Sequence, residues 1–214
     1  MVHGLRYSSL SASFGISHST ISKILDEVLP ILYDYFQQFI SNEIQNLDSI
    51  PKSILSDSIT CIIDGTIHFV DRHPFSKYSR ADKKGKFIQT IYLINFNGEI
   101  IAFETNIPGH LSDNAIPKRS TLFHRIMGEY YALADTGFNN IKYVTAGFKA
   151  NQLKTSNQIY WDIHSRKEQK KIEHVNSWIK KFKCLKHAEF ISEKHLIYIV
   201  MIASGLLNFK KFYS

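Results

Sequence analysis

Two aspartates each end an apolar run of the sequence. Asp64 follows the run Ile59–Ile63, and Asp135 follows the run Tyr130–Ala134. A carboxylate at the end of a buried strand is costly unless a positive charge lies beside it, and a divalent cation commonly supplies that charge. A third acid, Glu173, lies in a basic segment with helical spacing. We therefore expect these three carboxylates to form a metal site.

Such a site suits the cleavage of phosphodiester bonds. The reaction needs an activated water or hydroxyl and a leaving oxygen whose charge is neutralised, and two Mg²⁺ ions about 4 Å apart do both. Magnesium prefers hard oxygen ligands and keeps several waters, so two or three carboxylates suffice. The expected cofactor is therefore Mg²⁺ or Mn²⁺, bound as two ions.

Several of these residues also have a purely structural interpretation. Glu173 lies at the margin of the apolar stripe of its helix, but it could instead pair with Lys170 or Lys180 on a solvated surface. Asp113 is either a further acidic ligand or the N-cap of a helix that begins at Asn114. The ten histidines do not cluster at ligand spacing, so no zinc site is expected.

The formal net charge of +7 is compatible with a polyanionic partner. Many basic proteins bind no nucleic acid, so the distribution of the charge is more informative. One basic cluster lies in a single loop and comprises Lys77, Arg80, Lys83, Lys84 and Lys86. The other lies on the late helix, where the expected DNA contacts are Arg166, Lys170 and Lys180. Either cluster alone could be a solvated face, but together they flank the acids and favour a phosphate backbone across the site.

The first 30 residues predict a helix–turn–helix. Gly15 occupies the turn position that tolerates a positive φ, and Ser17 can cap a second helix over His18–Leu29, before Pro30 interrupts it. The residues expected at buried spacings are Leu10, Phe14, Ile16, Ile21 and Ile24. The residues expected to face the major groove are Ser17, His18, Ser19, Ser22 and Lys23. The alternative is a helical hairpin that only packs on the rest of the protein.

The remaining pattern predicts an α/β domain with a mixed sheet flanked by helices. Asn97-Gly98 is a strong hairpin signal. The expected elements are a connector helix over 31–47, a linker over 48–57, strands over 59–64, 87–96, 99–106, 130–135 and 141–145, and helices over 114–127, from near 166, and over 193–208. The expected domains are residues 1–47, with the helix–turn–helix and connector, and residues 58–214, the nuclease domain.

The composition indicates an intracellular protein without a membrane partner. No apolar run approaches the roughly 18 residues of a membrane span, and the N-terminus lacks the apolar core of a signal peptide. The two cysteines, Cys61 and Cys184, make neither a disulfide framework nor a zinc site.

Four short motifs resemble, in order, those of DDE-superfamily transposases, with PIF/Harbinger-type endonucleases and bacterial insertion-sequence transposases the most similar. They are Ile63–Thr66, Pro108-Gly109 with Asp113, Leu133–Phe138, and the segment from Lys170 through His174 to Leu185. The similarity covers residues 58 to 209, and a helix–turn–helix usually precedes it. The family often has Arg after the glutamate, where this chain has His174. The resemblance implies a ribonuclease H-like fold.

The resemblance also implies a function. The metal-binding triad falls on Asp64, Asp135 and Glu173, and the expected partner is double-stranded DNA, both the terminal inverted repeats of an element and a target site. Such enzymes nick DNA and join the freed 3′ hydroxyl to the target. A homodimer and a Myb-like DNA-binding partner are further expectations, as is a location on DNA, in the nucleus of a eukaryote or in the nucleoid or cytoplasm of a bacterium. The alternative is a truncated or domesticated copy that binds DNA without cutting it.

Overall fold

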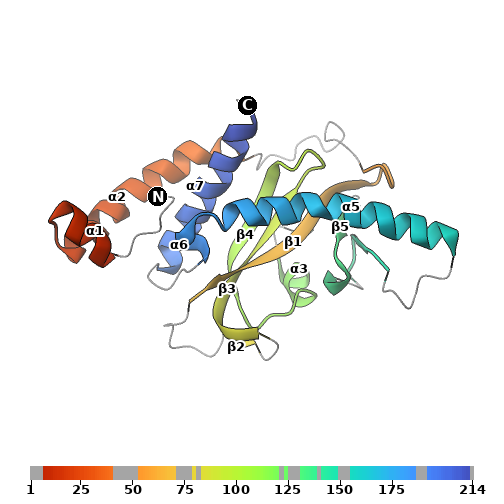
Figure 1. The fold of residues 1–214 in the computed structure, drawn as a ribbon, viewed down its shortest axis with the longest axis horizontal. Coiled ribbons are helices and arrows are strands. Elements are labelled where there is room, and N and C mark those ends of the chain that lie inside the picture. Colours follow the sequence, from red (N-terminus) through yellow and green to blue (C-terminus); the bar gives the residue numbers. More distant parts are fainter. Residues whose placement is uncertain are drawn as a thin grey trace.

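A mixed sheet forms the centre of the protein (Figure 1). The computed structural model describes residues 7–40, 53–70, 79–80, 83–120, 123–124, 131–138, 141–148, 155–186 and 192–212. The strands are β1 (Ile59–Phe69), β2 (Ser79–Arg80), β3 (Lys83–Ile94), β4 (Ile100–Pro108), β5 (Tyr131–Ala134) and β6 (Val144–Ala146). Their order is β4-β3-β1-β5-β6, and β2 pairs with the start of β3. β1 is antiparallel to β3 and parallel to β5, so the predicted mixed sheet is confirmed.

The sheet is buried on both faces, as the two-sided apolar pattern of β1 predicts. Ile62 packs into a cluster with residues of α5 (Ser156–Ile179), α6 (Lys183–Lys186) and α7 (Glu193–Phe212). Ile63 packs into a second cluster on the other face, with residues of the short helix α3 (Ala115–Arg119) and the 3-10 turn η3 (Thr136–Phe138). No helix in the described ranges is both long and apolar enough to cross a membrane.

The predicted hairpin is confirmed at Asn97-Gly98. Gly98 has φ 78°, in the region that favours glycine. The Asn95 side chain closes the turn, because its Oδ1 accepts the backbone N–H groups of Asn97 at 3.0 Å and Glu99 at 2.9 Å.

The helix–turn–helix is present, but its second helix is longer than predicted. Helix α1 (Tyr7–Phe14) is followed by Gly15 with φ 66° and by α2 (His18–Gln37). The expectation that Pro30 ends this helix is wrong. Proline removes one helical hydrogen bond, and we attribute the continuity of α2 to its packing along α7, where Leu29 is buried.

The predicted burial of Phe14 and Ile24 is also wrong, since their side chains are 69% and 44% exposed. α7 contacts the side of α2 that carries Asp26, Tyr33 and Phe36, whereas a second apolar stripe with Ile24 and Val28 is exposed. Periodicity alone could not tell which stripe would find a partner.

Two other helices have boundaries that differ from the predicted ones. The basic helix begins at Ser156, well before Arg166, because Thr155 and Gln158 form a reciprocal capping box. α3 ends at Arg119 rather than near Met127, although residues 123–124 are helical again. The connector beyond residue 40 and residues 48–52 of the predicted linker lie outside the described residues.

A buried histidine connects three strands to α6. His68 is 0% exposed. Its Nδ1 lies 2.6 Å from the carbonyl oxygen of Leu185, which can only accept, so Nδ1 carries the proton. Its Nε2 therefore accepts from the Thr90 hydroxyl at 2.9 Å, and Thr90 in turn accepts from Thr105 at 2.6 Å. Burial lowers the pKa of His68 to about 4, although the bond to Leu185 opposes that shift.

We expect this histidine to make the protein sensitive to acid. The unfolded chain binds a proton at His68 near pH 6.5 but the folded protein only near pH 4, so its contribution to the free energy of unfolding is complete above pH 6.5 and falls as the pH is lowered. The difference is roughly 3 kcal/mol. Denaturant titrations of wild type and His68→Asn between pH 7.5 and pH 4 should show a shallower pH dependence for the variant. Parallel curves would contradict the assignment.

The contact between α2 and α7 gives a second prediction. A Cβ at Gly205 would lie 2.6 Å from the backbone oxygen of Phe36 and 2.7 Å from its Cβ, so the two helices meet at a glycine. Gly205→Ala should lower the free energy of unfolding by roughly 2 kcal/mol, because the helices must separate. The matched control is Gly65→Ala, since a Cβ there meets nothing within 4 Å. Equal thermal stability of the two variants would contradict this account.

Candidate functional site

The pairing of β1 with β5 places two of the predicted acids side by side. The strands are parallel, with Ile62 opposite Leu133. Asp64 and Asp135 each lie two residues beyond that pair, and both Ile62 and Leu133 pack toward α5. Because alternate residues of a strand point to the same face, both aspartates are expected on the α5 side at the same end of the sheet.

Asp113 joins them from the segment between β4 and α3. A Cβ at Gly137 would lie 2.9 Å from Oδ1 of Asp135 and 3.4 Å from Oδ2 of Asp113, so both carboxylates border the space above this glycine. The N–H of Gly137 donates to Oδ1 of Asp135 at 2.7 Å. The alternative role of Asp113 as a helix cap is wrong, because the N-cap of α3 is Asn114 and its side chain makes no capping bond.

Asp64 is the most perturbed acid of this group. Burial raises its pKa to about 7, the N–H of Gly65 at 2.7 Å opposes the shift, and the nearby carboxylates of Asp135 and Asp113 raise the pKa further. The positive charge of Lys180 lowers it. The ionised carboxylate is thus disfavoured unless additional positive charge reaches it.

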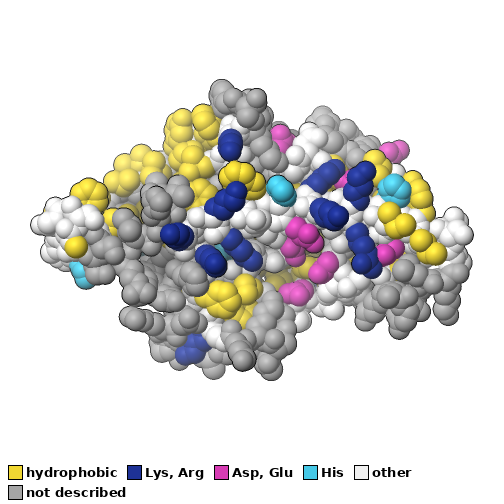
Figure 2. Space-filling model, viewed as in Figure 1, with side chains coloured by type: hydrophobic (Ala, Val, Ile, Leu, Met, Phe, Trp, Pro, Cys, Tyr) yellow, Lys and Arg dark blue, Asp and Glu magenta, His cyan; other side chains and the backbone are white. Residues whose placement is uncertain are grey.

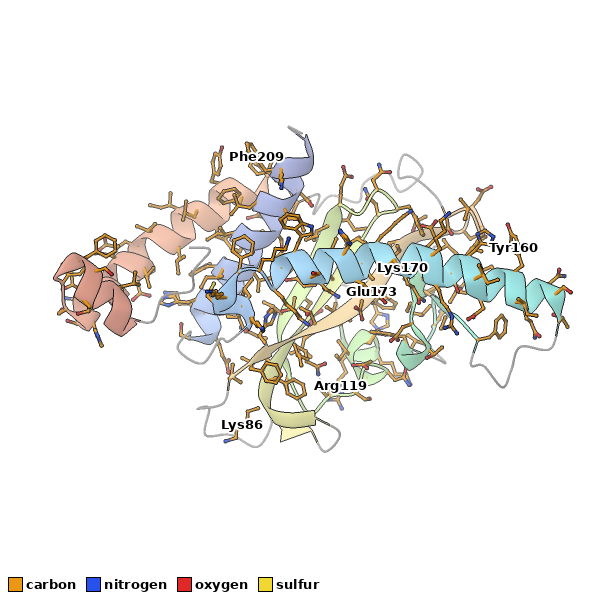
Figure 3. All side chains as sticks on the ribbon, viewed as in Figure 1. Lys86, Arg119, Tyr160, Lys170, Glu173 and Phe209 are labelled. Carbon is orange, nitrogen blue, oxygen red and sulfur yellow. The ribbon has the colours of Figure 1, made fainter. Side chains whose placement is uncertain are left out.

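Helix α5 carries the third predicted acid. Asp64, Glu173 and Lys180 line one open pocket of about 510 Å³, together with Asn176, Lys181 and Lys186. Glu173 is exposed at this pocket (Figure 3). Figure 2 shows acidic side chains gathered near the middle of this face, with Lys and Arg side chains on either side.

Two side chains of α5 that have no predicted role hold the helix against the sheet. Nε2 of Gln169 donates to the backbone oxygen of Ala134, directly before Asp135. Nδ2 of Asn176 donates to Oδ2 of Asp64 at 2.7 Å. Both residues share a helix side with Glu173, and that shared side was the only signal in the sequence.

The acidic side chains lie near one another but do not form a complete set of metal ligands. Within the described ranges, no three His, Cys, Asp or Glu side chains surround one point at ligand distance. Asp64, Asp113 and Asp135 interact electrostatically at the sheet end, and Glu173 shares a pocket with Asp64. The site is therefore a set of hard oxygen donors in which Asp64 connects Asp113 and Asp135 at the sheet end to Glu173 at the pocket.

The predicted DNA contacts are distributed over two regions. Ser17 is the N-cap of α2, accepting the N–H of Thr20 at 3.1 Å, and His18, Ser19 and Lys23 are exposed whereas Ser22 is half-buried. On α5, Lys170 and Lys180 are exposed, and exposed Arg166 pairs with Asp162 at 2.8 Å. Of the basic loop, Lys77 and the side chains of Arg80, Lys83 and Lys84 lie outside the described residues, and Lys86 is half-buried.

Comparison with protein families matches both parts of the chain. Residues 63–208 match the model of the DDE superfamily endonucleases, a range that includes Asp64, Asp113, Asp135 and Glu173. Residues 1–38 match the model of the helix-turn-helix of DDE superfamily endonucleases. Searches of curated proteins and of solved structures gave no significant match. The first match spans most of the chain and the second precedes it in the order the family uses, so this chain belongs to the DDE superfamily endonucleases.

Proposed function

We propose that this protein is a metal-dependent DNA endonuclease of transposase type in which Asp64, Asp135 and Glu173 are catalytic. The observation that carries the proposal is the register of β1 and β5, which places Asp64 and Asp135 side by side facing the helix of Glu173. Family membership supports a nuclease or transposase function in general.

The donor chemistry fits a divalent cation such as Mg²⁺ or Mn²⁺. The carboxylates are hard oxygen ligands, and the pKa of Asp64 is raised mainly by its burial, with the nearby carboxylates of Asp135 and Asp113 adding to the shift. Oδ1 of Asn176 is buried and accepts no hydrogen bond from the described residues, while its Nδ2 donates to Asp64. When bound, such ions acidify the attacking water and neutralise the leaving oxygen. The proposed site holds two such divalent cations.

The protein's own residues have distinct roles in this proposal. Asp64 is oriented by the N–H of Gly65 and the amide of Asn176, and Asp135 by the N–H of Gly137. Glu173 joins Asp64 and Asp135 as a metal ligand by rotation of its exposed side chain, without movement of α5. Asp113 adds negative charge beside Asp135 as an auxiliary ligand.

Basic side chains would position the DNA strand at these acids. Lys180, Lys181 and Lys186 line the same pocket as Asp64 and neutralise phosphates there. Lys170 and Arg166 extend this surface along α5. Ser17, His18, Ser19, Ser22 and Lys23 read a DNA groove through the helix–turn–helix.

Several finer expectations depend on the resemblance to Harbinger-type proteins. They are recognition of terminal inverted repeats, joining of a 3′ hydroxyl to a target site, a homodimer, a Myb-like partner, and action on DNA in a nucleus or nucleoid. The division into residues 1–47 and 58–214 also stays a prediction, and α2 packs on α7 across that division.

Nicking of supercoiled plasmid tests the proposal directly. Wild type should convert supercoiled to open-circular DNA with Mg²⁺ or Mn²⁺, and Asp64→Asn, Asp135→Asn and Glu173→Gln should each slow the reaction at least a hundredfold. The loss is large because each variant removes a charged ligand. Equal nicking by wild type and Asp64→Asn would remove Asp64 from the mechanism.

The Asp64→Asn variant also controls for folding. Because burial raises the pKa of Asp64 from 3.8 to about 7, ionisation of Asp64 lowers the free energy of unfolding as the pH rises between these values, and the loss is complete above pH 7. The variant should therefore be at least as stable as wild type at pH 8. DNA binding without nicking by wild type, in either metal, would support the non-catalytic alternative.

The salt dependence of DNA binding tests the basic surface. Lys180→Ala should weaken binding and lower the slope of log affinity against log salt by about one unit, since one phosphate contact is lost. Fluorescence anisotropy with a labelled duplex between 50 and 300 mM salt measures that slope. Lys142→Ala is a matched control, because Lys142 stacks at 4.6 Å over the Tyr143 ring and lines neither pocket. A slope unchanged by Lys180→Ala would remove Lys180 from the interface.

A further inference from the structure

A second pocket, of about 490 Å³, lies on the other flank of α5. Phe96, Val175 and Leu207 provide its apolar surface, Trp178 forms a wall, and Lys170 and Lys210 are basic side chains at its lining. Glu173 lines the acidic pocket and the next residue, His174, lines this one, so the helix alone separates them.

Trp178 lines the second pocket and contacts one lysine from the lining of each pocket. Nζ of Lys181 lies 3.4 Å from the centre of its ring and Nζ of Lys210 lies 4.5 Å from it. Lys181 lines the acidic pocket and Lys210 lines the second one. The indole is half-buried, lies outside the two buried core clusters and lines the second pocket, and Lys181, which lies over its ring, lines the acidic pocket.

The chemistry of the second pocket is specific. An apolar lining with an aromatic wall suits a flat, weakly polar ring, and lysines beside it suit an anion attached to that ring. A phosphate alone would gain nothing from Phe96, Val175 and Leu207. The volume is in the range that holds a small organic ligand. The charge of Lys171 is already offset by Glu168 at 2.5 Å, which leaves Lys170 and Lys210 as the side chains for the anion.

We propose that this pocket receives one unpaired base of the DNA, stacked on Trp178, with its phosphate bound by Lys170 and Lys210. The assignment rests on the proposed function, because it needs a DNA strand in the acidic pocket. A strand that passes the acids reaches the second pocket by crossing α5 at Trp178. A paired base cannot enter, so the DNA must present a base that has left its stack.

The test compares two duplexes that differ at one position. Both carry an unpaired nucleotide at the same place, with a base in one and an abasic residue in the other, and binding is measured without divalent cations so that no cutting occurs. Wild type should bind the base-containing duplex roughly tenfold or more tightly than the abasic one, the effect of one stacked base. Trp178→Ala should abolish that difference and leave the affinity for the abasic duplex nearly unchanged.

Tyr160→Ala is the matched control, because Tyr160 is a 59% exposed aromatic side chain on the same helix that does not line the pocket. It should keep the preference for the base. Lys210→Gln should weaken both duplexes alike, since each retains the phosphate. If Trp178→Ala does not fold, Trp161→Phe leaves Trp178 as the single tryptophan of the chain, whose fluorescence should be quenched by the base-containing duplex only.

The outcomes separate this inference from the proposed function. Equal wild-type affinity for the two duplexes, or equal weakening of both by Trp178→Ala, overturns the base pocket while nicking at the acids stands. Absence of binding to any DNA overturns both. If the abasic duplex quenches the fluorescence of Trp178 as strongly as the base-containing duplex does, the stacking of a base on Trp178 is also overturned.

Discussion

Parallel pairing of β1 with β5 is the constraint on which the candidate site depends. With Ile62 opposite Leu133, the two aspartates that follow are held at the same end of the sheet by backbone hydrogen bonds. A shift of one residue would point one carboxylate to the opposite face. The apolar residues before each aspartate prevent that shift, because they must stay in the core.

Helix α5 combines two tasks that conflict energetically. Its buried stripe of Ile172, Val175 and Ile179 packs on the sheet, while its next side, which carries Glu173, remains open to solvent at the pocket that it shares with Asp64. The bonds from Gln169 to Ala134 and from Asn176 to Asp64 hold the helix at that boundary. Positive charges of the protein itself offset the negative charge of the Asp64 carboxylate only in part. Such a loss of stability is common at residues that serve ligand binding.

The helix–turn–helix is attached by α2, which packs on α7 at the close approach of Phe36 and Gly205. The pair of Asp26 with His195 at 2.9 Å joins the same two helices. α7 also covers the sheet and lines the second pocket through Leu207 and Lys210, so a single helix connects the helix–turn–helix to the flank of α5 that carries Trp178.

The amino-acid pattern alone predicted the strands, the Asn97-Gly98 turn and the helix–turn–helix, because these features depend on local spacing and turn chemistry. It also singled out the three acids, whose role stays a prediction. It failed where a distant partner decided the outcome. Pro30 lies within a helix because α7 supports it, Ile24 is exposed because α7 covers only one stripe of α2, and Asp113 borders Asp135 instead of capping α3. The pocket beside Trp178 was also invisible, since its walls come from a hairpin and two helices that are brought together only by folding.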